Sequence, residues 1–164
     1  MNEDVSRAIN EQINREFYAA YLYLAMSAHF EAEALEGFAH WMRLQAQEEL
    51  GHATRLFDYL LERGARVELG AIEAPPTSFG SPLAIAEQAL AHERKVSEQI
   101  NGIYALAAER GDYATQVHLQ WFLTEQVEEE NSGETMVERL RMAGENRAAL
   151  LILDREVAAR ASAE

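Results

Sequence analysis

Cysteine is absent from the 164 residues of the chain. Disulfide bonds, thiolate metal sites and a thiol nucleophile are therefore excluded. Proline is scarce as well: the three prolines, Pro75, Pro76 and Pro82, lie in one short segment. The proline-free stretches on either side can form long uninterrupted helices. No apolar run approaches the roughly 20 residues of a membrane-spanning helix, so we expect no membrane partner.

Basic residues are also few. The chain has 14 Lys and Arg against 28 Asp and Glu, a formal net charge of −14. Because phosphate binding needs concentrated positive charge, nucleic acid is not an expected partner. The acidic excess has two interpretations, a charge that keeps the protein soluble or a surface that attracts cations. The first residues, Met1 to Asp4, lack the basic and apolar regions of a signal peptide, which predicts a cytoplasmic protein.

Apolar residues recur every three or four positions through most of the sequence, which predicts an all-α protein. The expected helices cover approximately residues 4–32, 35–63, 82–110, 113–143 and 146–160. The connection over 64–81 is long and contains Gly and Pro, and a short strand over 67–69 is one interpretation of it. Short connections favour antiparallel neighbours. We therefore predict a single domain over 1–164: a four-helix bundle with a long crossover between helices two and three and a short fifth helix.

The apolar stripe of each long helix is interrupted near its middle by side chains that can bind metals. They are Glu16 on the first helix, Glu49 and His52 on the second, Glu93 on the third, and Gln126 and Glu129 on the fourth. Residues three apart share a helix face, so the spacing of Glu49 and His52 directs both inward. Because buried like charges need compensation, we expect a bound cation where the four stripes meet.

The predicted ligand set is rich in oxygen, has one nitrogen and no sulfur. This argues against a structural zinc site and favours iron or manganese. Glu49 lies where it can bridge two ions. Glu16 and His52 then complete one position, and Glu93 with Glu129 the other, as in carboxylate-bridged di-iron bundles.

Over essentially its whole length the sequence resembles the non-haem bacterial and archaeal ferritins. The resemblance is carried by residues 14–24, 37–42, 47–52 and 121–130. It implies a ferritin-like fold and a ferroxidase centre with Glu16, Glu49 and His52 at the first iron position. It also implies Glu49, Glu93 and Glu129 at the second, with Gln126 close by and Tyr23 beside the centre. A third, lower-affinity iron site is implied at Glu48, Glu125, Glu128 and Glu129.

Two departures separate the chain from bacterioferritins, which place a haem-ligating methionine after the bridging Glu and a second Glu-x-x-His on the fourth helix. Here these positions hold Leu50 and Ser132, so no haem is expected. Tyr23 has three interpretations: core packing, one-electron donation, or a hydrogen bond to an iron ligand. We interpret His29, His40, His92 and His118 as surface or packing residues, and Trp41 and Trp121 as fillers of the core or an interface.

The expected function is iron storage with ferroxidase activity. Fe(II) and O2 or peroxide are the expected reactants, and ferric oxide is the expected deposit inside a homo-oligomeric shell of about 24 subunits, as the resemblance implies. Two alternatives remain open from the sequence. One is a di-iron or di-manganese oxidase with an organic substrate, and the other is a metal-binding shell protein without catalytic activity.

Overall fold

A computed structural model describes residues 1–161, with side chains to residue 159. Its helices are α1 (Glu3–Ala32), α2 (Glu36–Glu62), α3 (Pro82–Glu109), α4 (Tyr113–Ala143) and α5 (Arg147–Ala161). The predicted all-α bundle with a short fifth helix is confirmed, and each predicted boundary lies within one residue of the observed one. The predicted domain extends to residue 164, and residues 162–164 lie outside the described part.

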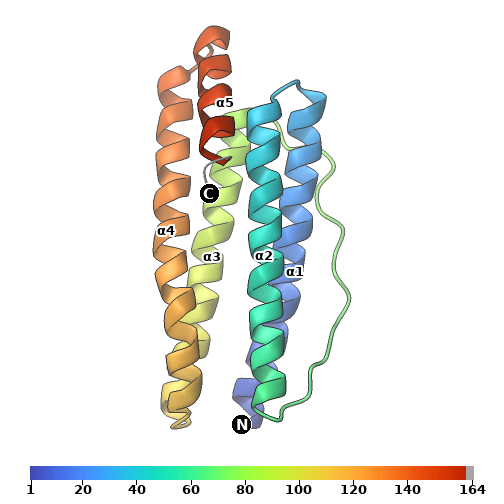
Figure 1. Ribbon diagram of the computed structural model, residues 1–164, viewed down its shortest axis with the longest axis vertical. Helices are drawn as coiled ribbons and strands as arrows, with labels where there is room; N and C mark the ends of the chain where they lie inside the picture. Colours follow the sequence, from blue (N-terminus) through green and yellow to red (C-terminus); the bar gives the residue numbers. More distant parts are fainter. Residues whose placement is uncertain (162–164) are drawn as a thin grey trace.

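The four long helices run side by side, with α1 antiparallel to α2 and α3 antiparallel to α4 (Figure 1). The crossover over residues 63–81 runs the length of the bundle along α1, from the end of α2 to the start of α3 (Figure 1). Because of it, α2 and α3 point the same way. The short α5 folds back beside α2 and α4 at the end of the bundle where α2 begins (Figure 1). No helix among the described residues is long and apolar enough to cross a membrane.

The strand suggested for residues 67–69 is wrong, because the crossover satisfies its backbone groups on α1 instead. Asn10 accepts a hydrogen bond from the backbone N–H of Glu68 at 2.7 Å and donates to the carbonyl of Arg66 at 3.0 Å. Asn14 repeats the arrangement with the N–H of Gly70 at 3.0 Å and the carbonyl of Ala71 at 3.2 Å. Two side-chain amides one turn apart therefore make the backbone hydrogen bonds that a partner strand would make.

Most long helices begin at a side chain that caps the free backbone N–H groups. Asn2, Ser81 and Asp112 do so for α1, α3 and α4. The residue before α2, Leu35, has no capping side chain. The acceptor comes instead from α5, where the Asp154 carboxylate accepts from the N–H of Phe38 at 2.9 Å. A buried helix end is thus satisfied by a distant segment of the chain.

The apolar core is divided into two parts by polar residues at mid-height. One part includes Met26, Phe30, Phe38, Leu90 and Met136, and the other includes Ile9, Ile13, Leu56, Ile100 and Phe122. On every long helix, the metal-binding residue types predicted from the sequence lie between the two parts.

Gly133, whose presence inside a helix the sequence does not explain, lies against α3. A Cβ atom there would be 3.1 Å from Cδ1 of Leu90.

Candidate metal centre

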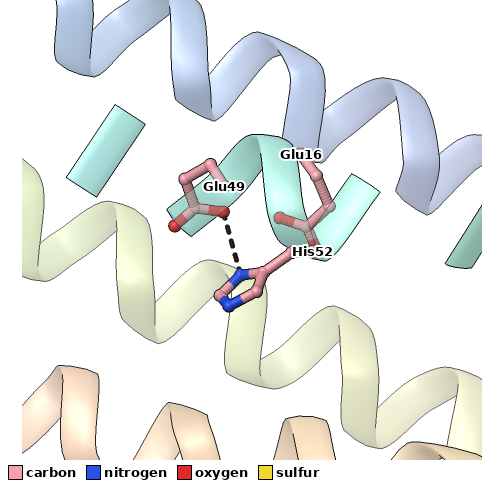
Figure 2. Close-up of side chains that lie close together, drawn as sticks. All are labelled: Glu16, Glu49 and His52. Carbon is pink, nitrogen blue, oxygen red and sulfur yellow. Dashed lines mark hydrogen bonds and ion pairs between the residues drawn. The ribbon is translucent and has the colours of Figure 1, made fainter. Parts of the chain in front are cut away.

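Three side chains on α1 and α2 come together in the gap between the two apolar parts. One ligand atom from each of Glu16, Glu49 and His52 lies within 4.8 Å of the others. All three are buried, with exposures of 0%, 1% and 4%. Figure 2 shows Glu49 and His52 next to each other on α2, with Glu16 reaching in from α1. Nδ1 of His52 is 3.3 Å from Oε2 of Glu49. Among the described residues, this is the one such cluster of His and acidic side chains.

The position of these side chains follows from the helical repeat. On α1, Glu16 continues the buried stripe that contains Ile9, Ile13 and Tyr23. On α2, Glu49 and His52 are one turn apart and share the buried face. Because both helices are free of proline and kink-forming pairs, the stripes stay aligned along the bundle.

Uncharged side chains donate hydrogen bonds to Glu93 on α3 and to Glu129 on α4. The hydroxyl of Tyr23 donates to Oε1 of Glu93, and Nε2 of Gln126 donates to Oε2 at 3.2 Å. Gln45 donates to Oε2 of Glu129 at 2.8 Å. Glu93 is buried, whereas Glu129 is half-buried. Two of the three interpretations of Tyr23 agree with the structure: its ring packs in the apolar core, and its hydroxyl hydrogen-bonds to a predicted metal ligand.

Burial and mutual repulsion disfavour the ionised form of these carboxylates. Burial raises the pKa of Glu16 well above its ordinary value, and the neighbouring Glu49 raises it further. Burial likewise raises the pKa of Glu49, with Glu93 adding to the effect. The pKa of Glu129 rises to about 7, chiefly through burial and then through Glu93 and Glu48. A cation among these groups would favour their ionised forms.

An acidic cleft opens beside the centre between α2 and α4. It has a volume of about 420 Å³. Its lining includes all four residues that the family resemblance assigned to a third site: Glu48, Glu125, Glu128 and Glu129. Glu48 and Glu128 are exposed, while Glu129 is half-buried and its charge acts on the buried Glu49. The cleft therefore places a group of carboxylates next to the predicted centre.

Several residues near the centre were not predicted from the sequence to take part in it. Gln12 and Gln45 hydrogen-bond to Glu16 and Glu129. Trp121, interpreted as a filler, sets its ring edge-on to His52 with centroids 5.5 Å apart. The guanidinium carbon of Arg55 lies over that indole, 4.1 Å from the ring centroid. The sequence signal available for Gln12 was its position one turn before Glu16 on the inward face.

The other histidines pack rather than cluster with acidic groups. His118 stacks on Tyr59 with ring centroids 3.9 Å apart, and burial lowers its pKa to about 4. His92 lies against the rings of Tyr18 and Tyr23. His29 contacts the carbonyl of Gly80 at 3.1 Å. None of these contacts brings a further imidazole to the Glu16, Glu49 and His52 cluster.

The donor atoms suit a divalent metal ion that prefers oxygen with limited nitrogen, such as iron or manganese. One observation points the same way. Oε2 of Glu16 is buried and accepts no hydrogen bond from a donor group among the described residues, so the Glu16 carboxyl is left to share a proton with the neighbouring Glu49. A buried carboxylate oxygen without a donor is costly, and a metal ion is the partner that the neighbouring Glu49 and His52 side chains can share.

The sequence matches the family model described as "Ferritin-like domain" over residues 6–143. The chain belongs to the ferritin family. It is 41% identical over 160 residues to the bacterial non-heme ferritin of Bacteroides fragilis, covering 98% of this chain and 99% of that protein. It is also 41% identical to the bacterial non-heme ferritin of Staphylococcus saprophyticus, covering 98% and 96%.

Solved ferritin structures superpose closely on the model. The open pore ferritin of the hyperthermophilic archaeon Archaeoglobus fulgidus aligns with a TM-score of 0.95 and 47% identity, covering 96% of this chain and 98% of that one. An engineered closed form of the same ferritin aligns with a TM-score of 0.94 and 48% identity, covering 96% of each. The predicted family is thereby confirmed, and family membership supports iron storage as the role of the chain.

Proposed function

We propose that the chain is a ferroxidase that oxidises Fe(II) and deposits it as ferric oxide inside a shell of its own copies. The observation that carries this proposal is the buried cluster of Glu16, Glu49 and His52, with Glu93 and Glu129 held beside it by neutral donors. Four carboxylates and one imidazole supply enough ligand atoms for two metal ions. The proposed reaction needs two electrons, one from each Fe(II).

Two Fe(II) ions bind as substrate, one at Glu16 and His52 and the other at Glu93 and Glu129, with Glu49 between them. One electron leaves each ion, and O2 takes up both electrons and two protons to become hydrogen peroxide. Peroxide as oxidant takes the same two electrons and two protons to give two waters. The carboxylates favour the ferric product because the higher charge gains more from each anionic ligand.

The acidic cleft offers the product a path out of the centre. Glu129 belongs to both places, because it lines the cleft and raises the pKa of the buried Glu49. A ferric ion that leaves the centre meets Glu48, Glu125 and Glu128 next. Hydrolysis then turns each hydrated Fe(III) into ferric oxyhydroxide with release of three protons. No haem takes part in this scheme.

A homo-oligomeric shell of about 24 subunits would hold that mineral. Support comes from large apolar side chains that a single chain leaves exposed, including Tyr113, Val117, Val127, Met142 and Ile152. Tyr113 and Val117 lie one turn apart on one face of α4, and we assign these apolar neighbours to contacts with other copies of the chain. The net charge of −14 on each subunit gives the shell the sign that attracts Fe(II).

The test compares single-site variants in the initial rate of aerobic Fe(II) oxidation, followed by ferric absorbance. Glu16→Gln and His52→Ala should each slow oxidation by about tenfold or more, because each removes a direct ligand. Glu62→Gln makes the same charge change at an exposed position of α2 and should behave as the unchanged protein. Undiminished oxidation in both site variants would contradict the assignment.

A further inference from the structure

Gln12 is a fully buried polar residue, with 0% of its surface exposed. Burying an amide without hydrogen bonds costs on the order of 1–3 kcal/mol in proteins, so its contacts carry information. Nε2 of Gln12 donates to Oε1 of Glu16 at 2.8 Å. Its Oε1 accepts from Nη1 of Arg15 at 3.3 Å. Both ends of the amide are therefore engaged within one turn of α1.

The hydrogen-bonding chemistry of Arg15 determines which way the Gln12 side-chain amide points. A guanidinium only donates hydrogen bonds, so the oxygen of Gln12 must face Arg15. The other end of the amide, its N–H group, therefore faces Glu16 and donates to Oε1. Arg15 is in turn paired with Glu11 at 3.3 Å on the outer side of the helix. The result is a directed chain from a half-exposed cation to a buried carboxylate.

The two oxygens of Glu16 are thereby made unequal. Oε1 is occupied by the Gln12 amide, whereas Oε2 is buried and accepts no hydrogen bond from a donor group among the described residues. A half-turn of the carboxylate would exchange its two oxygens, and the N–H group of Gln12 would then hold the other one. One oxygen is therefore held by the amide in either orientation. Because the amide holds Oε1, Oε2 is the oxygen left for a ligand shared with Glu49 and His52, whose ligand atoms lie within 4.8 Å of a Glu16 oxygen.

We propose that Gln12 is a positioning residue for the metal ligand Glu16: its N–H group holds Oε1 and leaves Oε2 as the single ligating oxygen. The inference rests on the proposed function, because it assumes that Glu16 binds the metal substrate. Donors around a ligand commonly fix its orientation, and their loss typically costs 10–100-fold in metal affinity. Here the donor is neutral, so it orients the carboxylate without adding a competing charge.

The experiment uses Co(II) as a probe in the assembled, metal-free protein, followed by calorimetry and by visible absorption. The Co(II) bound at this position is defined as the fraction lost in both Glu16→Ala and His52→Ala. Gln12→Met preserves the size of the side chain but removes its N–H donor. It should weaken that Co(II) binding by about 10–100-fold. With both oxygens of Glu16 released, a second one can coordinate, so the absorption bands should also weaken and shift.

Gln88→Met is the matched control. It removes a side-chain amide that donates to the carbonyl of Phe79, away from the centre, and should leave Co(II) at the Glu16 position unchanged. A second test variant, Gln12→Leu, also removes the N–H donor from the buried position and adds no charge. If Gln12→Met does not fold, the same Co(II) measurements are made on this second variant. A purely structural role would lower thermal stability without changing the Co(II) spectrum.

Wild-type Co(II) affinity and spectrum in the folded Gln12 variants, alongside loss of binding in Glu16→Ala, would overturn the positioning role alone. Unchanged Co(II) binding in Glu16→Ala itself would instead overturn the proposed metal function of the cluster. The two failures are therefore distinguishable in one set of titrations.

Discussion

Asp154 on α5 accepts a hydrogen bond from the backbone N–H of Phe38, in the first turn of α2. The same stretch of α5 lies so close to α2 that a Cβ atom at Gly37 would come within 1.9 Å of the Asp154 carbonyl oxygen. Since Leu35 supplies no capping side chain, the start of the helix that carries Glu49 and His52 depends on α5. The short last helix is thus part of the bundle rather than an appendage.

Asp154→Ala should lower the free energy of unfolding by about 1–2 kcal/mol, the usual cost of losing a cap. Asp154→Asn retains an oxygen acceptor and should lose less. Thermal unfolding of the metal-free protein measures both. Asp58→Ala removes an exposed carboxylate from α2, the helix that Asp154 caps, and serves as the control. Equal melting temperatures for Asp154→Ala and the unchanged protein would show that the cap contributes nothing.

The pH dependence of stability should report the raised pKa of Glu129, which burial, Glu93 and Glu48 bring to about 7 from an ordinary 4.5. A carboxyl whose pKa is higher in the folded chain contributes stability that is complete below the unfolded value and is lost as the pH rises through the folded value. Between about pH 4.5 and about pH 7, metal-free protein therefore gains stability from Glu129 on acidification, by up to about 3 kcal/mol.

Glu129→Gln should remove that contribution, so the metal-free variant should melt higher than the unchanged protein at neutral pH and the same near pH 4.5. The lowered pKa of His118 acts in the opposite sense, since its stabilising neutral form is lost on acidification. The informative quantity is therefore the difference between variant and unchanged protein. Glu128→Gln, on the exposed side of the cleft, is the control. Parallel pH profiles for all three proteins would refute the prediction.

Tyr23 should matter through its hydroxyl, which donates to Oε1 of Glu93. Tyr23→Phe leaves the ring in the core and removes one buried hydrogen bond to a carboxylate, so we expect a loss of about 1.5–3 kcal/mol of stability. Metal affinity on the Glu93 side should fall by about tenfold or more. The measurement is a Co(II) titration of each variant beside its thermal melt.

The control for Tyr23 is Tyr104→Phe. Tyr104 is half-buried on α3, eleven residues from Glu93 and thus about 16 Å along the helix. It should change neither metal binding nor the rate of Fe(II) oxidation. If Tyr23→Phe binds Co(II) as tightly as Tyr104→Phe does, the hydroxyl has no role in holding Glu93.

The helices and the inward residues could be predicted from the sequence because their signals are local. In straight, proline-free helices a residue such as Glu16 or His52 must share a face with residues three and four positions away. The interruption of four apolar stripes at similar depth then indicates a polar centre. Relationships between distant segments have no such signal. The cap from Asp154 and the contact of Gly133 with Leu90 arise only from how the helices pack.

The crossover shows the same limit. Residues 67–69 have strand-forming side chains, but Asn10 and Asn14 on α1 take up the neighbouring backbone groups and no partner strand is present among the described residues. The role of Gln12 could not be predicted from the sequence for a related reason. A single Gln on an inward face has no spacing that distinguishes it from packing, and its meaning depends on Arg15 and Glu16 being within reach.

The central claim is that Fe(II) is oxidised at the buried centre and then stored. The most direct measurement adds Fe(II) aerobically to the purified protein in increasing amounts, follows ferric absorbance, and then sediments the protein and measures iron in the pellet. We predict rapid oxidation, with iron sedimenting with the protein in large excess over subunits, and slow oxidation in Glu16→Gln. Oxidation that stops near two irons per chain would contradict storage and support a di-metal oxidase. No acceleration over buffer would contradict the ferroxidase itself.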